Sequence, residues 1–326
     1  MNSSLRVASF LFTVGLLSVT CAAQEDATSK AKTKKKKASA PFQWVNPLPE
    51  KHHAALTHAT FRSSSMDIDV GYVIMLPPDY QRSPDVRFPV VYYLHGGRPG
   101  NELKSIRLAD TIYAAMDDGD VSQAIYVFVN GGPVSHYNMP GDPSKQGASV
   151  FVKELIPHVD ATYRTVAKRS GRALEGFSQG GRGTMRLSLR YPGLFCSAAA
   201  GGGGYEAEKR ISEEDGYENP GLRFAAGDNT WDLARTYAKR KTPVVRWMLF
   251  VGDKGINYEN NLAYMKFLDS LGIKYGRIVV PGAEHSAKQI YESEALSIIR
   301  FHAKNFVKAA TWDAHDGQQG IPIRVH

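Results

Sequence analysis

Cysteine is nearly absent from this chain, which has only Cys21 and Cys196 among its 326 residues. If the N-terminal stretch that carries Cys21 is removed, no intramolecular disulfide is possible. Cys196 lies in an apolar context, so we expect a small buried side chain rather than a reactive thiol. The cysteine count therefore excludes a disulfide framework as the basis of stability.

Long hydrophobic runs are also missing. The apolar stretch at residues 7–19 is too short to span a membrane, so we expect no stable membrane insertion. It follows one positive charge and precedes the small residues 21–23, which predicts a signal peptide over residues 1–23 and a secreted or periplasmic location. A lipid anchor at Cys21 is the less favoured alternative, because Thr20 fits poorly before a lipidated cysteine.

Basic charge is concentrated in one short segment. The formal net charge is +8, yet Lys30, Lys32 and residues 34–37 all lie before the first apolar pattern. This composition predicts a disordered linker over residues 24–41, serving as a spacer or as a loose contact with an anionic surface. Because the tail supplies much of the positive charge, the charge is no evidence for nucleic-acid binding.

From residue 42 onward, strand patterns alternate with helix patterns. Residues 56–63 and 69–76 alternate as antiparallel strands do, whereas residues 88–94 and 124–130 are continuous apolar runs, typical of strands buried on both faces. Such an order predicts one α/β domain over residues 42–326. We expect a mostly parallel central sheet with antiparallel N-terminal strands and helices on both faces.

A GxSxG motif at residues 176–180 is the most specific chemical signal. It follows a short strand pattern and precedes a helix pattern, which is the context of a nucleophile elbow. Small residues must flank the serine because the turn is tight, and Gly176 and Gly180 meet that need. We therefore predict that Ser178 is a nucleophile, with an ordinary tight turn as the alternative.

A serine nucleophile needs a base and donors for the oxyanion. His285 follows the last strand pattern and precedes the last helix, which makes it the predicted base, against a surface loop histidine. The predicted oxyanion donors are the N–H of Gln179 and that of Gly97, with Gly96 as a further possibility. His95 is expected to shape this loop.

Of the three catalytic residues, the acid that orients the base is the least clearly defined by the sequence. Asp253 is the only aspartate in the loop after residues 244–251, so we predict it as the third catalytic residue, with a surface turn carboxylate as the alternative. Glu259 is a poorer candidate, because it should lie inside a helix. Glu206 and Glu208 are further possibilities.

At this point the chain resembles the putative esterase family, which groups esterase D-like, feruloyl, acetylxylan and enterochelin-type esterases. The matching segments run in the family's order and are VGY at 70–72, LPPDY at 76–80, YLHGG at 93–97, ELIP at 154–157, YRT at 163–165, GFSQGG at 176–181, YPGLF at 191–195, and PG at 281–282 with His285. The resemblance implies an α/β-hydrolase fold and a serine carboxylesterase with no metal and no organic cofactor.

One position departs from the family's pattern. The family usually places its acid three residues after the strand-end glycine, and counting from Gly252 that position is Gly255. Three outcomes stay open: a full esterase with Asp253 as acid, a slow esterase on a Ser–His dyad, or a catalytically weak relative.

The sequence supports several hypotheses on function. The first is an exported serine esterase that acts on a small-molecule or oligosaccharide ester, such as a carbohydrate-linked acetyl or feruloyl ester. The second is a binding protein for a glycan or siderophore, motivated by Gly255, and the third is acyl transfer to a sugar. The long connections at residues 131–148 and 201–242 are expected to form the substrate pocket. Their aromatic residues favour either stacking on a substrate or simple packing: His136, Tyr137, Tyr205, Tyr217 and Trp231.

Overall fold

The structure, a computed structural model, describes residues 41–315, with side chains as far as Thr311. The predicted signal peptide, Cys21 and nearly all of the predicted linker therefore lie outside the described residues, as does the end of the C-terminal tail. The described residues belong to one compact unit that begins at Pro41.

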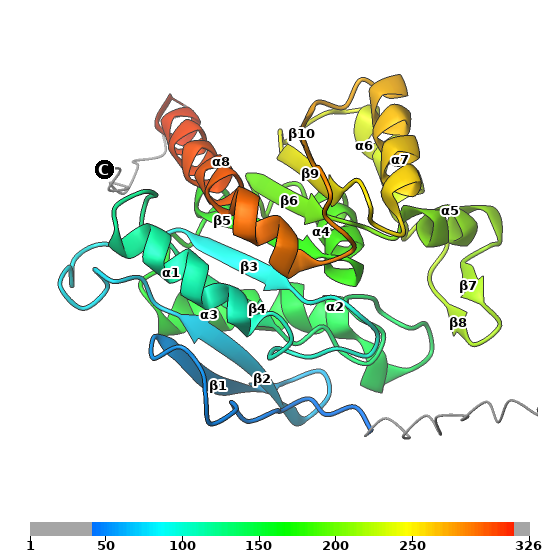
Figure 1. The fold of residues 1–326 in the computed structure, drawn as a ribbon. Coiled ribbons are helices and arrows are strands. Elements are labelled where there is room, and N and C mark those ends of the chain that lie inside the picture. Colours follow the sequence, from blue (N-terminus) through cyan, green and yellow to red (C-terminus); the bar gives the residue numbers. More distant parts are fainter. Residues whose placement is uncertain (1–40, 316–326) are drawn as a thin grey trace, which may run out of the picture. The chain divides into compact units, whose positions relative to one another are not determined.

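Strands and helices alternate along the described chain (Figure 1). The strands are β1 (Leu56–Ser63), β2 (Ile68–Met75), β3 (Val90–Leu94), β4 (Ile125–Val129), β5 (Arg172–Phe177), β6 (Ser197–Gly201), β7 (Tyr217–Asn219), β8 (Leu222–Arg223), β9 (Arg246–Gly252) and β10 (Tyr275–Val280). The helices are α1 (Ala109–Asp117), α2 (Gly147–Ser149), α3 (Ile156–Thr162), α4 (Gln179–Arg190), α5 (Tyr205–Glu213), α6 (Thr230–Ala238), α7 (Tyr258–Ser270) and α8 (Ala287–His315).

Eight strands form one sheet in the order β1-β2-β4-β3-β5-β6-β9-β10. Strands β3, β4, β5, β6, β9 and β10 run parallel, whereas β1 pairs antiparallel with β2, and β2 with β4. The predicted fold class is confirmed. In a parallel sheet all carboxyl ends meet at one edge, so the loops after β3, β5, β6, β9 and β10 gather there.

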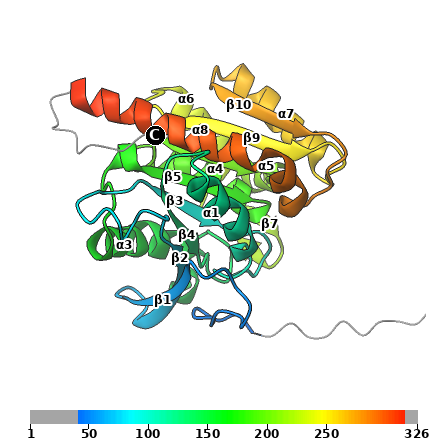
Figure 2. The same ribbon diagram turned by 60° about the vertical axis from the view of Figure 1, so that its left-hand side comes forward.

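Alternation along the strands divides the core into two layers. In β3, Val90 and Tyr92 join a core with α3, α4, α6 and α7, whereas Val91 and Tyr93 join a second core with α1 and α8. Each strand side chain points to the face opposite its neighbour's, so a fully apolar strand fills both layers. Figure 2 shows α8 lying across the sheet, where it packs over β6 and β9.

Helix α8 is tied to the sheet by buried polar side chains. Tyr291 donates its hydroxyl hydrogen to Glu175 of β5, and His302 Nε2 lies 3.3 Å from the other oxygen of that carboxylate. His302 Nδ1 is 2.8 Å from Ser197 Oγ of β6. All four side chains are buried. Because buried polar groups are costly unless paired, this network fixes how α8, and the loop before it, meets the sheet.

Two connections contain more structure than the sequence predicted. Residues 201–242 hold α5, the two-stranded hairpin β7–β8, and α6. Ahead of α3, a π-helical segment spans Val150–Leu155. Short helices between long apolar strands carry a weak periodic signal, because few turns are available to repeat it.

Candidate active site

Ser178 lies at a sharp turn between β5 and α4. Its backbone has φ 61° and ψ −116°, a conformation that L-residues rarely adopt. A Cβ at Gly180 would meet the carbonyl oxygen of Leu94, so helix α4 can approach β3 this closely only with glycine there. The predicted strand, turn and helix are present, and the turn has the strain typical of functional sites.

The structure brings Ser178 and His285 together from loops that are far apart in the sequence. Ser178 Oγ lies 2.9 Å from His285 Nε2, across 107 positions of sequence. His285 belongs to the loop between β10 and α8, and its ring packs against Phe177, with centroids 4.9 Å apart. Partial burial lowers the pKa of His285 below its ordinary value, which favours the neutral imidazole that a base requires.

Asp253 is not brought to His285. Its Oδ1 accepts a hydrogen bond of 2.7 Å from the backbone N–H of Gly282, and its own N–H donates to the carbonyl of Val280. Asp253 therefore links the loop after β9 to the loop that carries His285. Glu259 is exposed on α7, and Glu208 is buried against Thr230 and Arg182.

The residue at His285 Nδ1 is Asn257, whose Oδ1 lies 3.2 Å away. Gly255, the position at which the resemblance placed the acid, is adjacent: a Cβ there would lie 3.6 Å from Asn257 Oδ1 and 3.7 Å from the backbone nitrogen of His285. The amide oxygen thus occupies the space beside Gly255. Sequence reasoning missed Asn257 because it searched this loop for carboxylates alone.

The predicted oxyanion donors belong to two segments, the start of α4 and the glycine loop after β3. Gln179 is the first residue of α4, and the N–H groups of a helix's first turn have no partner within the helix. In the opposite loop, the Gly96 carbonyl faces the ring of His95, with Nδ1 3.2 Å away. Because the C=O and N–H of a trans peptide point in opposite directions, the N–H of Gly97 points away from that ring. Gly96 itself lies against Ser178.

Two residues that the sequence reasoning did not assign hold this glycine loop in place. His136 Nε2 donates to the His95 carbonyl at 3.0 Å, and Ser135 Oγ donates to the Gly97 carbonyl at 2.7 Å. His95 is structural, as expected: its Nε2 accepts from the N–H of Gly131. The rings of His95 and His136 are both buried and lie tilted against each other at 45°, with centroids 4.4 Å apart.

We expect this histidine pair to make the fold acid-sensitive. Burial lowers the pKa of His95 to about 4 and that of His136 well below its ordinary value near 6.5. As pH falls below about 6.5, the unfolded chain binds protons that the folded chain refuses, so stability is full above that pH and declines towards pH 4. Each histidine contributes up to about 1.4 kcal/mol per pH unit.

Urea unfolding at pH 7.5, 6.5, 5.5 and 5 measures this slope. The variant His136→Gln keeps an N–H donor but does not titrate, so its slope should be smaller than that of the unaltered chain. An equal slope in both proteins would contradict the assignment to His136. Other groups that titrate in this window, among them Glu208, whose pKa burial raises, are the same in both proteins, so the difference between the two slopes reports His136.

A charged network borders the site. Glu218 of β7 accepts from Arg98 at 2.8 Å and from Arg182 of α4 at 2.6 Å, and Arg98 also donates to Gln179 Oε1 at 3.3 Å. Burial alone would raise the pKa of Glu218, but Arg182 and Arg98 hold it below its ordinary value. Arg98 follows Gly97 directly, so Glu218 links the β7–β8 hairpin to α4 and to the glycine loop after β3.

Replacing Glu218 with glutamine should destabilise the protein by about 2 kcal/mol, because the fully buried Arg182 would lose the nearer of its two carboxylate partners and keep only Glu208. The matched control is Asp215→Asn, which breaks an exposed pair with Arg223 and should change stability by less than about 0.5 kcal/mol. Urea unfolding of both variants checks this prediction. Equal effects of the two substitutions would refute a special role for Glu218.

The aromatic residues of the long connections are mostly packing residues. His136, Tyr137, Tyr205 and Trp231 are buried, whereas Tyr217 is 40% exposed. Tyr137 stacks on Phe224 at 4.0 Å between centroids, and Arg186 lies 3.7 Å from its ring centroid. Of the two alternatives that the sequence left open, simple packing therefore applies to the four buried side chains.

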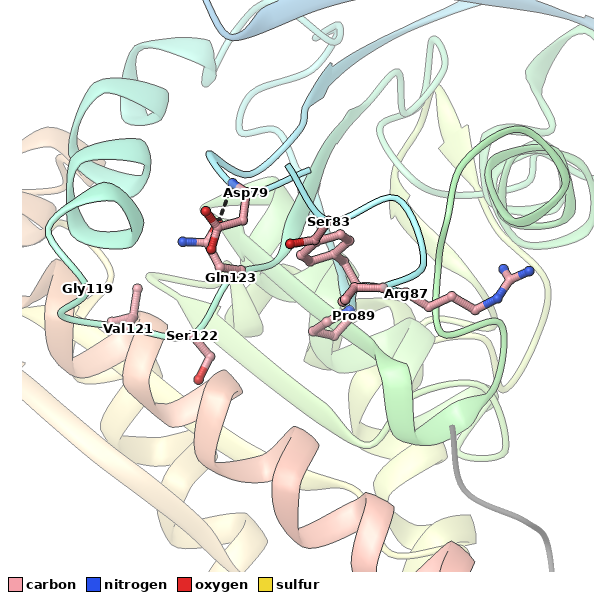
Figure 3. Close-up of a pocket in the computed structure, with 10 residues that line it drawn as sticks. Asp79, Ser83, Arg87, Pro89, Gly119, Val121, Ser122 and Gln123 are labelled. Atoms are coloured by element: carbon pink, nitrogen blue, oxygen red, sulfur yellow. Dashed lines mark hydrogen bonds between the residues drawn. The ribbon is translucent and has the colours of Figure 1, made fainter. Parts of the chain in front are cut away.

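A small surface pocket lies elsewhere in the molecule (Figure 3). Its lining includes Pro89 and Gln123, which precede β3 and β4, and Gln123 accepts a hydrogen bond from the N–H of Asp79. Since β3, β4 and β5 run parallel, this pocket lies at the amino ends of the strands, opposite the end that carries Ser178.

Two further searches covered only the described residues. Within residues 41–315, no group of three or more histidine, cysteine, aspartate or glutamate side chains could hold a metal ion. In the same part of the chain, no helix is long and apolar enough to cross a membrane.

Comparison with known proteins decides the family. The family model described as "Putative esterase" matches residues 63–266, which is more than half of the chain. The chain belongs to the putative esterase family. The resemblance inferred from the sequence motifs is thereby confirmed.

Among characterised relatives, an esterase of Mycobacterium tuberculosis is 28% identical over 151 residues, which are 45% of this chain and 32% of that protein. An endo-1,4-beta-xylanase/feruloyl esterase of Xylanibacter ruminicola is 26% identical over 159 residues, which are 44% of this chain and 21% of that protein. The chain thus spans a third or less of the length of these relatives.

Solved structures agree on the fold. A ferulic acid esterase superposes with a TM-score of 0.63 at 19% identity, covering 77% of this chain and 98% of that chain. An S-formylglutathione hydrolase from Staphylococcus aureus superposes with a TM-score of 0.62 at 16% identity, covering 76% and 98%. The chain therefore has the fold shared by α/β-hydrolase esterases.

Proposed function

We propose that this protein is a serine hydrolase of carboxylic esters, with Ser178 as nucleophile and His285 as base. The observation that carries the proposal is the 2.9 Å contact between Ser178 Oγ and His285 Nε2 at a strained strand-to-helix turn. A serine hydroxyl becomes a useful nucleophile only when a neighbouring base can accept its proton, and this contact is within hydrogen-bond reach.

The proposed reaction has two halves. Ser178 Oγ bonds to the ester carbonyl carbon while its proton passes to His285 Nε2; the C–O bond to the alcohol then breaks, and the alcohol leaves with that proton. Water next gives a proton to His285 while its oxygen bonds to the acyl carbon; the bond from that carbon to Ser178 Oγ then breaks, and His285 returns the proton to Oγ, which releases the acid and restores both residues. Donors at Gln179 and Gly97 would stabilise the oxyanion in both halves.

For the substrate we propose a carbohydrate-linked acetyl or feruloyl ester. The support is family membership together with similarity to a protein named endo-1,4-beta-xylanase/feruloyl esterase and to a structure named ferulic acid esterase. Export through the predicted signal peptide, also a proposal, would give access to such polysaccharide fragments. Comparing the N-terminal sequence of the mature protein with the gene product tests the export proposal.

Hydrolysis assays of the full chain test the activity. p-Nitrophenyl acetate, methyl ferulate, and acetylated and feruloylated xylo-oligosaccharides should be hydrolysed, and a fluorophosphonate should label the protein covalently. Transfer of the acyl group to an added sugar, detected by mass spectrometry, would point to acyl transfer instead of hydrolysis. Folded protein that neither turns over these esters nor takes up the label would disprove the proposal.

The second candidate function is a binding protein that retains the esterase fold. The observation in its favour is the neutral Asn257 at His285, where a carboxylate would stabilise the imidazolium formed during turnover. Affinity for a glycan or siderophore that is unchanged in Ser178→Ala, without any turnover, would favour this function.

A further inference from the structure

The side-chain amide of Asn257 is held by two main-chain carbonyl oxygens, those of Gly202 and Gly203, which we call the carbonyl cage. Its Nδ2 donates to the carbonyls of Gly202 and Gly203, the second at 3.1 Å, so both hydrogens of the amide are used. Turning the amide over would bring Oδ1 against these two carbonyl oxygens and leave them without a donor. The orientation of the Asn257 amide is therefore fixed, with Oδ1 towards His285.

The cage is itself rigid. The N–H of Gly202 donates to the carbonyl of Phe250 at 2.8 Å, which ties the loop after β6 to β9. Asn261, one turn further along α7, donates to the Gly203 carbonyl at 2.9 Å and to the Asn257 carbonyl at 2.8 Å. Asn257 and Asn261 are both buried, so the groups that orient the amide are shielded from competing water.

We propose that Asn257 is the positioning residue of His285, acting as a neutral acceptor whose orientation the Gly202 and Gly203 carbonyls select. An oxygen at Nδ1 holds the proton there, so Nε2 keeps its lone pair for the proton of Ser178. Where an asparagine replaces a catalytic aspartate and its amide is free to turn, it can fix the wrong tautomer, at a cost of about 10⁴ in turnover. Here the two carbonyls of the cage prevent the amide from turning, so Asn257 cannot select the wrong tautomer.

This cage also disfavours a carboxylate. An aspartate at position 257 would turn an oxygen, in place of the amide nitrogen, towards the carbonyls of Gly202 and Gly203. Three acceptors would then face one another without a hydrogen between them in a buried place. The site is therefore built for an amide, and the inference deepens the proposed function, on whose reaction it rests.

Among the described residues, the surroundings of His285 carry no charge that would stabilise its protonated form, which agrees with Asn257 acting as a neutral positioning residue. On its own loop Glu284 is exposed; on the neighbouring loop Lys254 is exposed and Asp253 is bound to Gly282. The residues that face it from β5 and the loop after β6, Phe177 and Gly202, carry no charge. Within residues 41–315 no ion pair involves His285, and burial is the cause that lowers its pKa.

The first test reads the tautomer directly in the unaltered full chain. Nitrogen-15 NMR at pH 8 of protein labelled at histidine, assigned with His285→Gln, should show His285 protonated at Nδ1 and not at Nε2. A ring protonated at Nε2 would overturn the proposal. This measurement needs no turnover, so it is independent of the proposed function. An inactive protein with the Nδ1–H tautomer would disprove the esterase function but support the positioning of His285 by Asn257.

The second test uses the pH dependence of kcat/KM. In the unaltered chain the acid limb should lie below pH 6.5, because no carboxylate stabilises the imidazolium. Asn257→Asp should move that limb upwards by about one pH unit or more, without raising kcat/KM at pH 8 above that of the unaltered chain. The matched control is Asn260→Asp, which adds the same charge on the first turn of α7 and should leave the limb in place.

Asn257→Ala should lower kcat by about 100-fold or more with little change in KM, since it removes the acceptor that orients the base and no substrate contact. An unchanged kcat and pH profile in this variant would overturn the proposal. So would an Asn257→Asp protein that gains 100-fold in kcat/KM with undiminished stability, because the amide would then be a defect and not a fitted part. If either variant fails to fold, the NMR measurement still decides.

Discussion

Ser178→Ala should reduce ester hydrolysis by about 10⁴-fold or more and abolish labelling by a fluorophosphonate. In the proposed reaction the Ser178 oxygen bonds to the acyl group, so its loss leaves only what binding and the oxyanion donors contribute. Initial rates with p-nitrophenyl acetate, and intact-protein mass after labelling, measure the two effects. KM should change little, because the methyl group that remains fills the same place.

Two further variants show that the loss comes from the hydroxyl. Ser65→Ala, at an exposed turn, should keep full activity and labelling. Ser178→Gly should also be inactive but about 1 kcal/mol more stable than Ser178→Ala, since glycine adopts the φ of 61° without strain. Residual labelling of Ser178→Ala equal to that of the unaltered chain would place the nucleophile elsewhere.

His285→Ala should have the second-largest effect, a loss of about 10³-fold or more in kcat at pH 7 to 8. Without the imidazole nothing takes the proton from Ser178 Oγ, which lies 2.9 Å from Nε2. Because hydroxide can partly replace a missing base, the remaining rate should rise steadily with pH and lose the acid limb seen in the unaltered chain. The pH profile of kcat/KM from pH 5 to 10 measures this change.

His52→Ala is the matched control for His285→Ala. His52 is an exposed histidine before the first strand, so its removal should leave both rate and profile unchanged. A His285→Ala protein that keeps the acid limb would show that another group controls the reaction. His95 and His136 would then be the nearest histidines to reconsider, although burial holds both of them neutral.

The sequence predicted the parts of the site that depend on local chain geometry. A nucleophile elbow needs glycine on both sides of the serine and a strand and helix around it, and one continuous segment, from the start of β5 to the end of α4, satisfies these needs. The position of His285 could be predicted because a loop after the last strand must reach the same edge of the sheet as the loop after β5. Both arguments use only the hydrophobic periodicity of the sequence and the order of strands, loops and helices along it.

The sequence could not identify the partner of His285. Asp253 and Asn257 lie four residues apart in one loop, and Asp253 has the expected chemistry. Two other loops determine which of these residues reaches His285. In the loop after β10 the Gly282 N–H binds Asp253, and in the loop after β6 two carbonyls bind Asn257. These contacts join segments about 30 and 55 residues apart, so no local pattern contains them.

The sequence by itself determined the α/β architecture, the family, and the pairing of a strained serine with a histidine. Hydrophobic alternation and glycine placement fix those features, because each depends on which backbone conformations and burial patterns neighbouring residues allow. The tertiary structure alone decided that Asn257 is the side chain at His285 Nδ1, and that Glu218 joins the β7–β8 hairpin to the glycine loop after β3. Such roles depend on distances of about 3 Å between groups that are far apart in the chain, and only folding sets those distances.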